Sequence, residues 1–147
     1  MTKPSTWCGQ SGLNQNKYRW IEKIPIDKLN QLLNALSIGR IQGLKALRRG
    51  VSGRITLLEI RGSQGRSAIE GEYNIRKTLG GLRSAMFIIT ETRTNRGDLL
   101  AITLHGGGWG HGVGMCQTGA MGMAKSGISF RSILMHYYNS SELVPLY

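Results

Sequence analysis

Trp109 and His111 stand in the part of the sequence best suited to chemistry, a segment with six glycines among the nine residues 106–114. Glycine loses more backbone entropy on folding than any other residue, so glycines at this density indicate a steric requirement. Either several positions need positive φ angles, or a ligand must approach the main chain. Trp109 offers an aromatic face that suits a sugar ring, or it fills the core beneath the loop. His111 can carry a proton, bind a metal ion, donate a hydrogen bond to a substrate or serve a structural role.

The spacing of these glycines excludes two nucleotide-binding loops. The dinucleotide pattern G-x-G-x-x-G fails from each start, because its third glycine falls on His111, Val113 or Met115. No Gly-Lys-Ser/Thr follows, which excludes a P-loop. What remains is a strand, a glycine loop and a helix N-terminus, whose N–H groups and partial positive charge can face a ligand. Gln117 lies just past the loop and can reach such a ligand.

Cys116 is expected in the first turn of that helix, where the helix dipole favours a thiolate. Three interpretations stay open: a buried small side chain, a nucleophile paired with His111, or part of a metal site. Cys8, Cys116 and His111, with His105 as a fourth donor, are ligand types that zinc uses, although their spacing matches no zinc-finger pattern. No cofactor is required by these patterns, and zinc is the candidate metal.

Arg48, Arg49 and Arg54 surround the pair Ser52-Gly53. They form either a solvated basic face or a cradle for carboxylates or phosphates. Cleavage of a glycoside by acid–base chemistry needs a well-placed carboxyl group. None of the eight Asp and Glu residues lies in the glycine segment, so no catalytic residue is nominated.

Strands and helices mixed without a βαβ rhythm predict an α+β fold of antiparallel hairpins and short helices, ending in the glycine loop and two helices. Strands are expected over 18–21, 52–61, 66–69, 86–92 and 99–104. Helices are expected after Pro25, over 73–79, over 115–126 and over 129–138. Asp27 should cap the first helix, which carries the apolar stripe Leu29, Leu32, Leu33 and Leu36 and should stop at Gly39. Ser129 should cap the last helix, with an apolar face of Phe130, Ile133, Leu134, Tyr137 and Tyr138 and with His136 exposed.

A chain of 147 residues fits one compact domain, here expected over 18–147 after an irregular lead-in over 1–17. The net charge of +11 predicts an attraction to polyanions: nucleic acid, anionic lipid headgroups or acidic wall polymers. Two cysteines do not make a disulfide scaffold. No apolar run is long enough for a membrane helix, and the first residues contain no apolar segment of the signal-peptide type, so no signal peptide is expected in this sequence.

The run GWGHGVGMCQ, from Gly108 to Gln117, closely resembles the C-terminal signature of the SpoIID/LytB family, that of stage II sporulation protein D and the amidase enhancer. The resemblance continues in Gly119-Ala120, Gly122-Met123-Ala124, Gly127 and the run ILMHYY over 133–138. Upstream it includes YRW over 18–20, RGVSGR over 49–54, Gly62-Ser63 and LGGLRS over 79–84. It therefore covers nearly the whole chain from Tyr18.

This resemblance implies a bacterial cell-envelope protein, outside the cytoplasm, that acts on peptidoglycan. The sporulation branch consists of lytic transglycosylases, which cleave glycan strands stripped of stem peptides; some members bind zinc through Cys and His, and the amidase enhancer stimulates a wall amidase. The chain departs from the family because the E-M-P segment that carries the catalytic Glu, and the A-L-K-A-Q-A-x-A-A-R-T stretch after it, do not occur. The chain therefore looks like the C-terminal half alone, inactive by itself, and no catalytic residue is carried over. The residues expected to contact substrate are Trp109, His111, Gln117, Gly110, Gly112, Arg49 and Arg54.

The expected partners are glycan strands, together with the missing N-terminal half or a wall hydrolase. A non-catalytic wall-binding or enhancer module is the main alternative. The hypothesis of a nucleic-acid-binding domain is supported only by the net charge, because no helix-turn-helix, RNA-recognition or zinc-finger signature occurs. A cysteine hydrolase built on Cys116 is a remote fourth hypothesis.

Overall fold

The computed structural model describes residues 6–10 and 18–144. Within this part the chain forms two compact units. We call Arg19–His111 the sheet unit, and residues 6–10, 18 and 112–144 the helical unit. Antiparallel sheets and short helices confirm the predicted α+β class. Within the described residues, no helix is both long and apolar enough to cross a membrane.

One sheet of the sheet unit has the strand order β1-β6-β5, all antiparallel, with β1 (Arg19–Pro25), β6 (Leu99–Gly107) and β5 (Phe87–Arg93). The inward row at its end consists of Trp20, Gly106 and Phe87, which are paired in register. The two aromatic rings lie 6.2 Å apart between centroids, on either side of the glycine. Strand β6 reaches Gly107, so the first two glycines of the glycine segment are strand and not loop.

The second sheet has the order β2-β3-β4, with β2 (Ile41–Arg49), β3 (Ile55–Gly62) and β4 (Gly65–Glu70). The predicted hairpin of β3 and β4 is confirmed. Strand β2 was not predicted. Its register against β3 shifts after Ile41 and again on either side of Arg48, and such bulges break the alternation by which a strand is found in a sequence.

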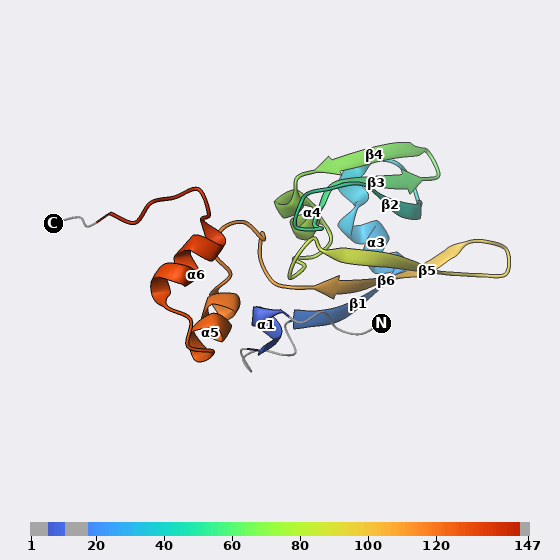
Figure 1. Ribbon diagram of the computed structural model, residues 1–147. Helices are drawn as coiled ribbons and strands as arrows, with labels where there is room; N and C mark the ends of the chain where they lie inside the picture. The colour runs from blue at the N-terminus through green and yellow to red at the C-terminus, as the bar shows by residue number, and fades with distance from the viewer. Residues whose placement is uncertain (1–5, 11–17, 145–147) are drawn as a thin grey trace. The chain divides into compact units, whose positions relative to one another are not determined.

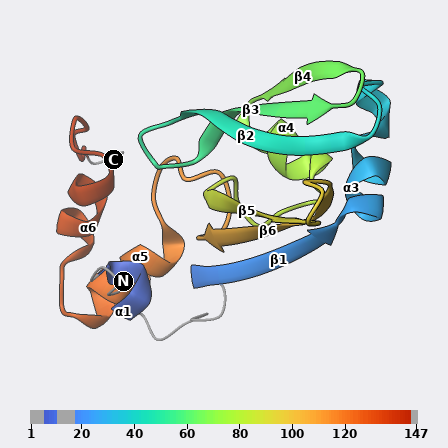
Figure 2. The same cartoon turned by 90° about the vertical axis from the view of Figure 1, so that its right-hand side faces the viewer.

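Two short helices lie beside the two sheets of this unit, as Figures 1 and 2 show, and residues of both sheets and both helices form one hydrophobic core. Helix α4 (Glu72–Thr78) packs on β3 and β4 and buries Ile75. Helix α3 (Ile26–Leu32) contacts β1, β2 and β6 and buries Leu29.

The predicted cap and end of the first helix are corrected. The N-cap is Pro25, and Asp27 lies in the first turn, where its carboxylate complements the helix dipole. The helix is followed by a 3₁₀ turn, η1 (Asn34–Leu36). This turn ends at Ser37, which has a left-handed conformation, and not at Gly39.

The helical unit contains α1 (Trp7–Gln10), α5 (Gln117–Lys125) and α6 (Phe130–Tyr137), with α5 in contact with both other helices. Helix α1 is a single helical turn inside the segment expected to be irregular; residues 1–5 and 11–17 of that segment lie outside the described residues. The cap at Ser129 is confirmed, because its Oγ accepts a hydrogen bond from the N–H of Ser132 at 3.2 Å.

The predicted apolar face of α6 is only partly covered within the structure. Ile133 is buried, and Leu134 and Tyr137 are half-buried. Phe130 and Tyr138 are exposed. His136 is exposed, as expected.

Candidate functional site

The first two glycines of the glycine segment allow close packing. A Cβ atom at Gly106 would collide with the indole of Trp20. One at Gly107 would lie 2.9 Å from both Arg19 Nη1 and Met86 Cε. Gly106 is glycine because the rigid Trp20 ring occupies the space, independently of any ligand, whereas the atoms near Gly107 are the ends of flexible side chains that can move aside.

The later glycines supply positive φ angles. Gly108, Gly110, Gly112 and Gly114 have φ angles of 71°, 79°, 72° and 73°, in the left-handed region that side chains disfavour. Every second residue from 108 to 114 therefore has a similar positive φ angle. The glycine pattern thus has a full steric explanation within the chain, while the segment stays accessible: His111 to Met115 are all exposed.

Buried side chains hold the turn over 108–111 in place. Trp20 Nε1 donates to the carbonyl of Gly108 at 3.1 Å, and Arg54 Nε donates to the carbonyl of Gly110 at 3.0 Å. The N–H of Gly110 donates to the carbonyl of Arg83 at 2.8 Å. Arg54 is only 8% exposed, so its guanidinium braces the turn from within.

Trp109 is presented outward by this turn and is 58% exposed. The guanidinium carbon of Arg83 lies 5.8 Å from the centre of its ring, in the range of a cation–π contact. Trp109 therefore does not fill the core.

An open groove of about 430 Å³ lies at the glycine end of the β1-β6-β5 sheet. Its outer floor is a row paired in register across the three strands: Ile21, His105 and Ile88. The two isoleucines, on either side of His105, are 69% and 67% exposed, which is unusual for large apolar side chains in one row. The groove is lined by Arg19, Trp20, Ile21, Arg49, Met86, Phe87, Ile88, His105, Gly106 and Gly107. We call it the sheet-end groove.

The cations of the groove stand beside an apolar floor. Arg49 is held by two hydrogen bonds, from Nη1 to the carbonyl of Gly53 at 2.9 Å and from Nη2 to the carbonyl of Phe87 at 2.8 Å. His105 lies exposed between the two isoleucines. Such a surface can receive the C–H face of a sugar ring while guanidinium and imidazole groups meet its polar substituents. No carboxylate is among the described residues that line it.

The structure distributes the predicted substrate residues over several places. Arg49 lines the groove, whereas Arg54 and Gly110 belong to the hydrogen-bonded turn that presents Trp109. His111 is exposed at the end of the sheet unit; Gly112 and Gln117 are exposed in the helical unit.

Sequence reasoning missed the groove residues Arg19, Ile21 and Ile88. The available signal was strand alternation, which puts Ile21 on the face opposite Trp20, and Ile88 opposite Phe87. Finding them as one patch requires the register of three strands.

Cys8 and Cys116 come together in the helical unit. Their Sγ atoms lie 3.1 Å apart, and Cys116 Sγ also accepts a hydrogen bond from the N–H of Gly119 at 3.4 Å, which makes Cys116 the N-cap of α5. Both thiols are half-buried. Gly119 lacks a Cβ because the Tyr137 hydroxyl and Cys8 Sγ fill that space.

The two thiols have pKa values shifted in opposite directions. Burial, followed by the hydrogen bond and charge of Cys116, raises the pKa of the Cys8 thiol. Burial also opposes ionisation of Cys116, but hydrogen bonds from Thr118, Cys8 and Gly119 outweigh it and lower the pKa of that thiol. Burial and the two sulfurs raise the pKa of Tyr137. Cys116 is therefore the thiol that ionises first.

Zinc can be tested against this cluster. Two thiolates on one tetrahedral zinc lie about 3.8 Å apart, given Zn–S bonds of about 2.3 Å, so the pair supplies suitable donors for half a site. Within residues 6–10 and 18–144, no three or more His, Cys, Asp or Glu side chains gather to complete one. A zinc ion bound by Cys8, Cys116 and His111 stays a prediction, for which the two thiols supply neighbouring donors.

Comparison with known proteins gives the class of this chain. It belongs to the family described as Domain of unknown function (DUF8618), whose family model matches residues 7–114. It is 35% identical over 136 residues to Stage II sporulation protein D of Bacillus subtilis (strain 168), which covers 89% of this chain and 37% of that protein. It is 46% identical over 70 residues to Stage II sporulation protein D of Bacillus amyloliquefaciens, covering 48% of this chain and 18% of that protein.

The similarity extends to a second type of relative. The Amidase enhancer of Bacillus subtilis (strain 168) is 28% identical over an alignment of 156 residues, which covers 97% of this chain and 22% of that protein. These matches confirm the predicted resemblance to the SpoIID/LytB family. The chain spans less than two fifths of the length of each of these relatives.

Proposed function

We propose that this chain has a cell-wall-related role of the SpoIID/LytB kind and binds peptidoglycan glycan strands through the sheet-end groove. The observation that carries the proposal is the row of Ile21, His105 and Ile88, two exposed isoleucines on either side of an imidazole. Arg19 and Arg49 add hydrogen-bond donors at the same groove. The relatives named for sporulation and for amidase enhancement support a location at the cell envelope.

The groove favours binding over cleavage. A glycoside hydrolase or lytic transglycosylase needs a carboxyl group beside the scissile bond, and the described groove residues supply guanidinium, imidazole and apolar groups. We propose that cleavage of peptide-stripped strands, as in a lytic transglycosylase, requires a carboxyl group from another polypeptide segment or a partner chain.

Retention on purified sacculi tests the binding proposal. The wild-type chain should be retained, and more strongly after stem peptides are removed, because the bare strand can lie in the groove. The double variant I21N/I88N should lose most of this retention, because two polar side chains replace the apolar floor. Leu100→Asn is the matched control: Leu100 is also an exposed apolar residue of this sheet, 45% exposed, but lies outside the groove. Equal retention of the double variant and the wild type would refute the groove as the binding surface.

Product analysis tests the statement on cleavage. Incubation of the chain with peptide-stripped glycan should release no anhydro-sugar ends, measured by mass spectrometry. Release of such ends would show that the chain contains a complete catalytic centre.

An enhancer role is the second candidate, because the Amidase enhancer matches along 97% of this chain. Adding the chain to a purified wall amidase and sacculi should then increase peptide release. An unchanged rate while the chain stays bound to the wall would leave simple glycan binding as the function.

A further inference from the structure

A second pocket lies in the sheet unit, away from the sheet-end groove. It has a volume of about 360 Å³ and forms where the start of β2, the end of β3 and the turn between β5 and β6 meet. Its lining consists of Arg40, Ile41, Gln42, Arg61, Ser63, Arg93, Gly97, Asp98 and Leu99. We call it the arginine pocket. Because β6 begins at Leu99 and ends at Gly107, the pocket and the groove lie at opposite ends of that strand.

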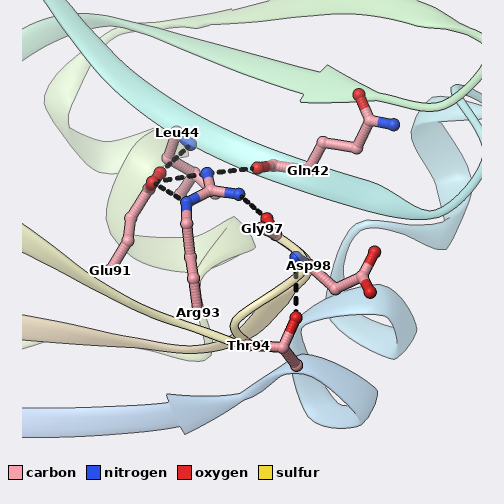
Figure 3. A network of polar contacts seen from close by, with 7 residues as sticks. All are labelled: Gln42, Leu44, Glu91, Arg93, Thr94, Gly97 and Asp98. Carbon is pink, nitrogen blue, oxygen red and sulfur yellow. Dashed lines mark hydrogen bonds and ion pairs between the residues drawn. The ribbon is translucent and has the colours of Figure 1, made fainter.

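Arg93 forms a rigid wall of this pocket, shown in Figure 3. Its Nη2 donates to the carbonyl of Gln42 at 2.8 Å, and its Nη1 donates to the carbonyl of Gly97 at 2.7 Å. Nε and Nη2 also contact Glu91 Oε2, at 3.0 and 2.5 Å. These contacts join β2 to the β5–β6 turn and offset the charge of Arg93.

The backbone behind Arg93 is held by further hydrogen bonds. Thr94 Oγ1 accepts from the N–H of Asp98 at 3.0 Å, as Figure 3 shows, and Glu91 Oε1 accepts from the N–H of Leu44 at 3.4 Å. The turn that carries Asp98 is therefore ordered before any ligand arrives, which lowers the entropy cost of binding.

Arg40 and Arg61 supply charge that is not offset. Ion pairs in the described part of the chain involve Arg48, Arg66, Arg76 and Arg93. In the same part, no hydrogen bond or ion pair is made by the guanidinium groups of Arg40 and Arg61, which are both exposed. Their side chains face a pocket whose lining contains one carboxylate, that of Asp98.

Gly43 shows how close two of the guanidinium groups lie. A Cβ atom at this position would lie 3.0 Å from Arg61 Nη2 and 3.5 Å from Arg93 Nη2. Two cations therefore converge here on one carboxylate, that of Glu91, whose Oε1 would lie 2.9 Å from the same Cβ atom. An added anion would reduce the repulsion that remains.

We propose that the arginine pocket binds the phosphate group of a polyol or sugar phosphate. The planar forks of Arg40 and Arg61 suit the oxygens of a phosphate, to which arginine donates paired hydrogen bonds. The pocket exceeds the size of a phosphate ion, so the esterified part of the ligand also fits. The Asp98 carboxylate and the Ser63 hydroxyl can accept or donate hydrogen bonds to its hydroxyl groups. The site is independent of the glycan groove, and neither proposal needs the other.

Titration with glycerol phosphate, followed by amide NMR shifts at constant ionic strength, tests this site. Glycerol phosphate should shift the amides of Gln42, Ser63 and Asp98 in a saturable way. The variant R40Q/R61Q should bind at least about ten-fold more weakly, because it loses two charge-assisted contacts. Arg96→Gln is the matched control, since Arg96 is an exposed arginine of the same turn outside the pocket lining, and it should bind like the wild type.

Several results would overturn the proposal. Equal shifts with sodium chloride would show a general salt effect, and equal affinity for succinate would remove the preference for phosphate. An equal loss of binding per removed charge in R96Q and R40Q/R61Q would show attraction by net charge alone. Unchanged amide shifts outside the pocket show that the double variant is folded. Binding or failure to bind sacculi through the groove does not alter any of these outcomes.

Discussion

Arg49 and Arg54 lie five residues apart and have different surroundings. Arg54 is almost fully buried and donates to the carbonyl of Gly110, whereas Arg49 lines the sheet-end groove while its donors hold two carbonyls. Cys116 is another residue defined by its contacts, because an N-cap position and three hydrogen-bonding neighbours stabilise its thiolate. In each case the residue type allows several chemical roles, and the burial and hydrogen-bond partners of the side chain decide which role it has.

The two thiols should react at different rates. Because the pKa of Cys116 is lowered and that of Cys8 is raised, Cys116 carries the larger thiolate fraction at any pH below their ordinary value of 9.0. Its alkylation by iodoacetamide in EDTA-containing buffer should therefore begin at lower pH. Peptide mapping by mass spectrometry measures both rates. In the urea-unfolded chain the two rates should converge, and faster labelling of Cys8 in the folded chain would contradict the assignment.

At the scale of elements, the end of strand β6 explains why the glycine segment begins as a strand. Gly106, on β6, sits between the rings of Trp20 on β1 and Phe87 on β5. The same strand places His105 on the outer face, one residue away. A single strand end therefore carries both the close packing inside and the groove floor outside.

Gly106→Ala should destabilise the protein by about 1–3 kcal/mol, as overpacking of a well-filled core does, because its methyl group would collide with the Trp20 ring. Urea unfolding followed by tryptophan fluorescence measures the change. Gly50→Ala is the control, since its Cβ atom would meet only Thr56 Cγ2 at 3.5 Å, and Gly50 has no positive φ angle. Equal stability of the two variants would show that the strand end adjusts without cost.

At the scale of the whole molecule, the net charge of +11 acts together with local surfaces. Long-range attraction to an anionic polymer depends on total charge and is screened by salt, whereas apolar contact in the groove is not. The two contributions can therefore be separated by their response to ionic strength.

Retention of the chain on sacculi should decrease as sodium chloride is raised. I21N/I88N should weaken retention at every salt concentration without changing this dependence, because it alters no charge. R40Q/R61Q should make retention less sensitive to salt. Sedimentation with sacculi over a salt series measures both effects. A salt dependence that changes in I21N/I88N would contradict the separation of charge attraction from apolar contact.

The sequence by itself determined the elements whose signals are local. Helix periodicity and the Ser129 cap located α6, the strands predicted over 86–92 and 99–104 correspond to β5 and β6, and the density of glycine indicated a steric requirement. These signals depend on neighbours a few residues away, which the sequence displays directly. The family resemblance came from the same kind of contiguous motif.

Only the tertiary structure decided how distant residues combine. It placed Ile21 beside His105 and Ile88, Arg40 and Arg61 beside Arg93, and Cys8 against Cys116. It also revealed strand β2, whose bulges hide its alternation. Each of these pairings depends on strand register or helix packing between segments far apart in the chain. Long-range contacts of that kind leave no periodic signal in either partner's sequence.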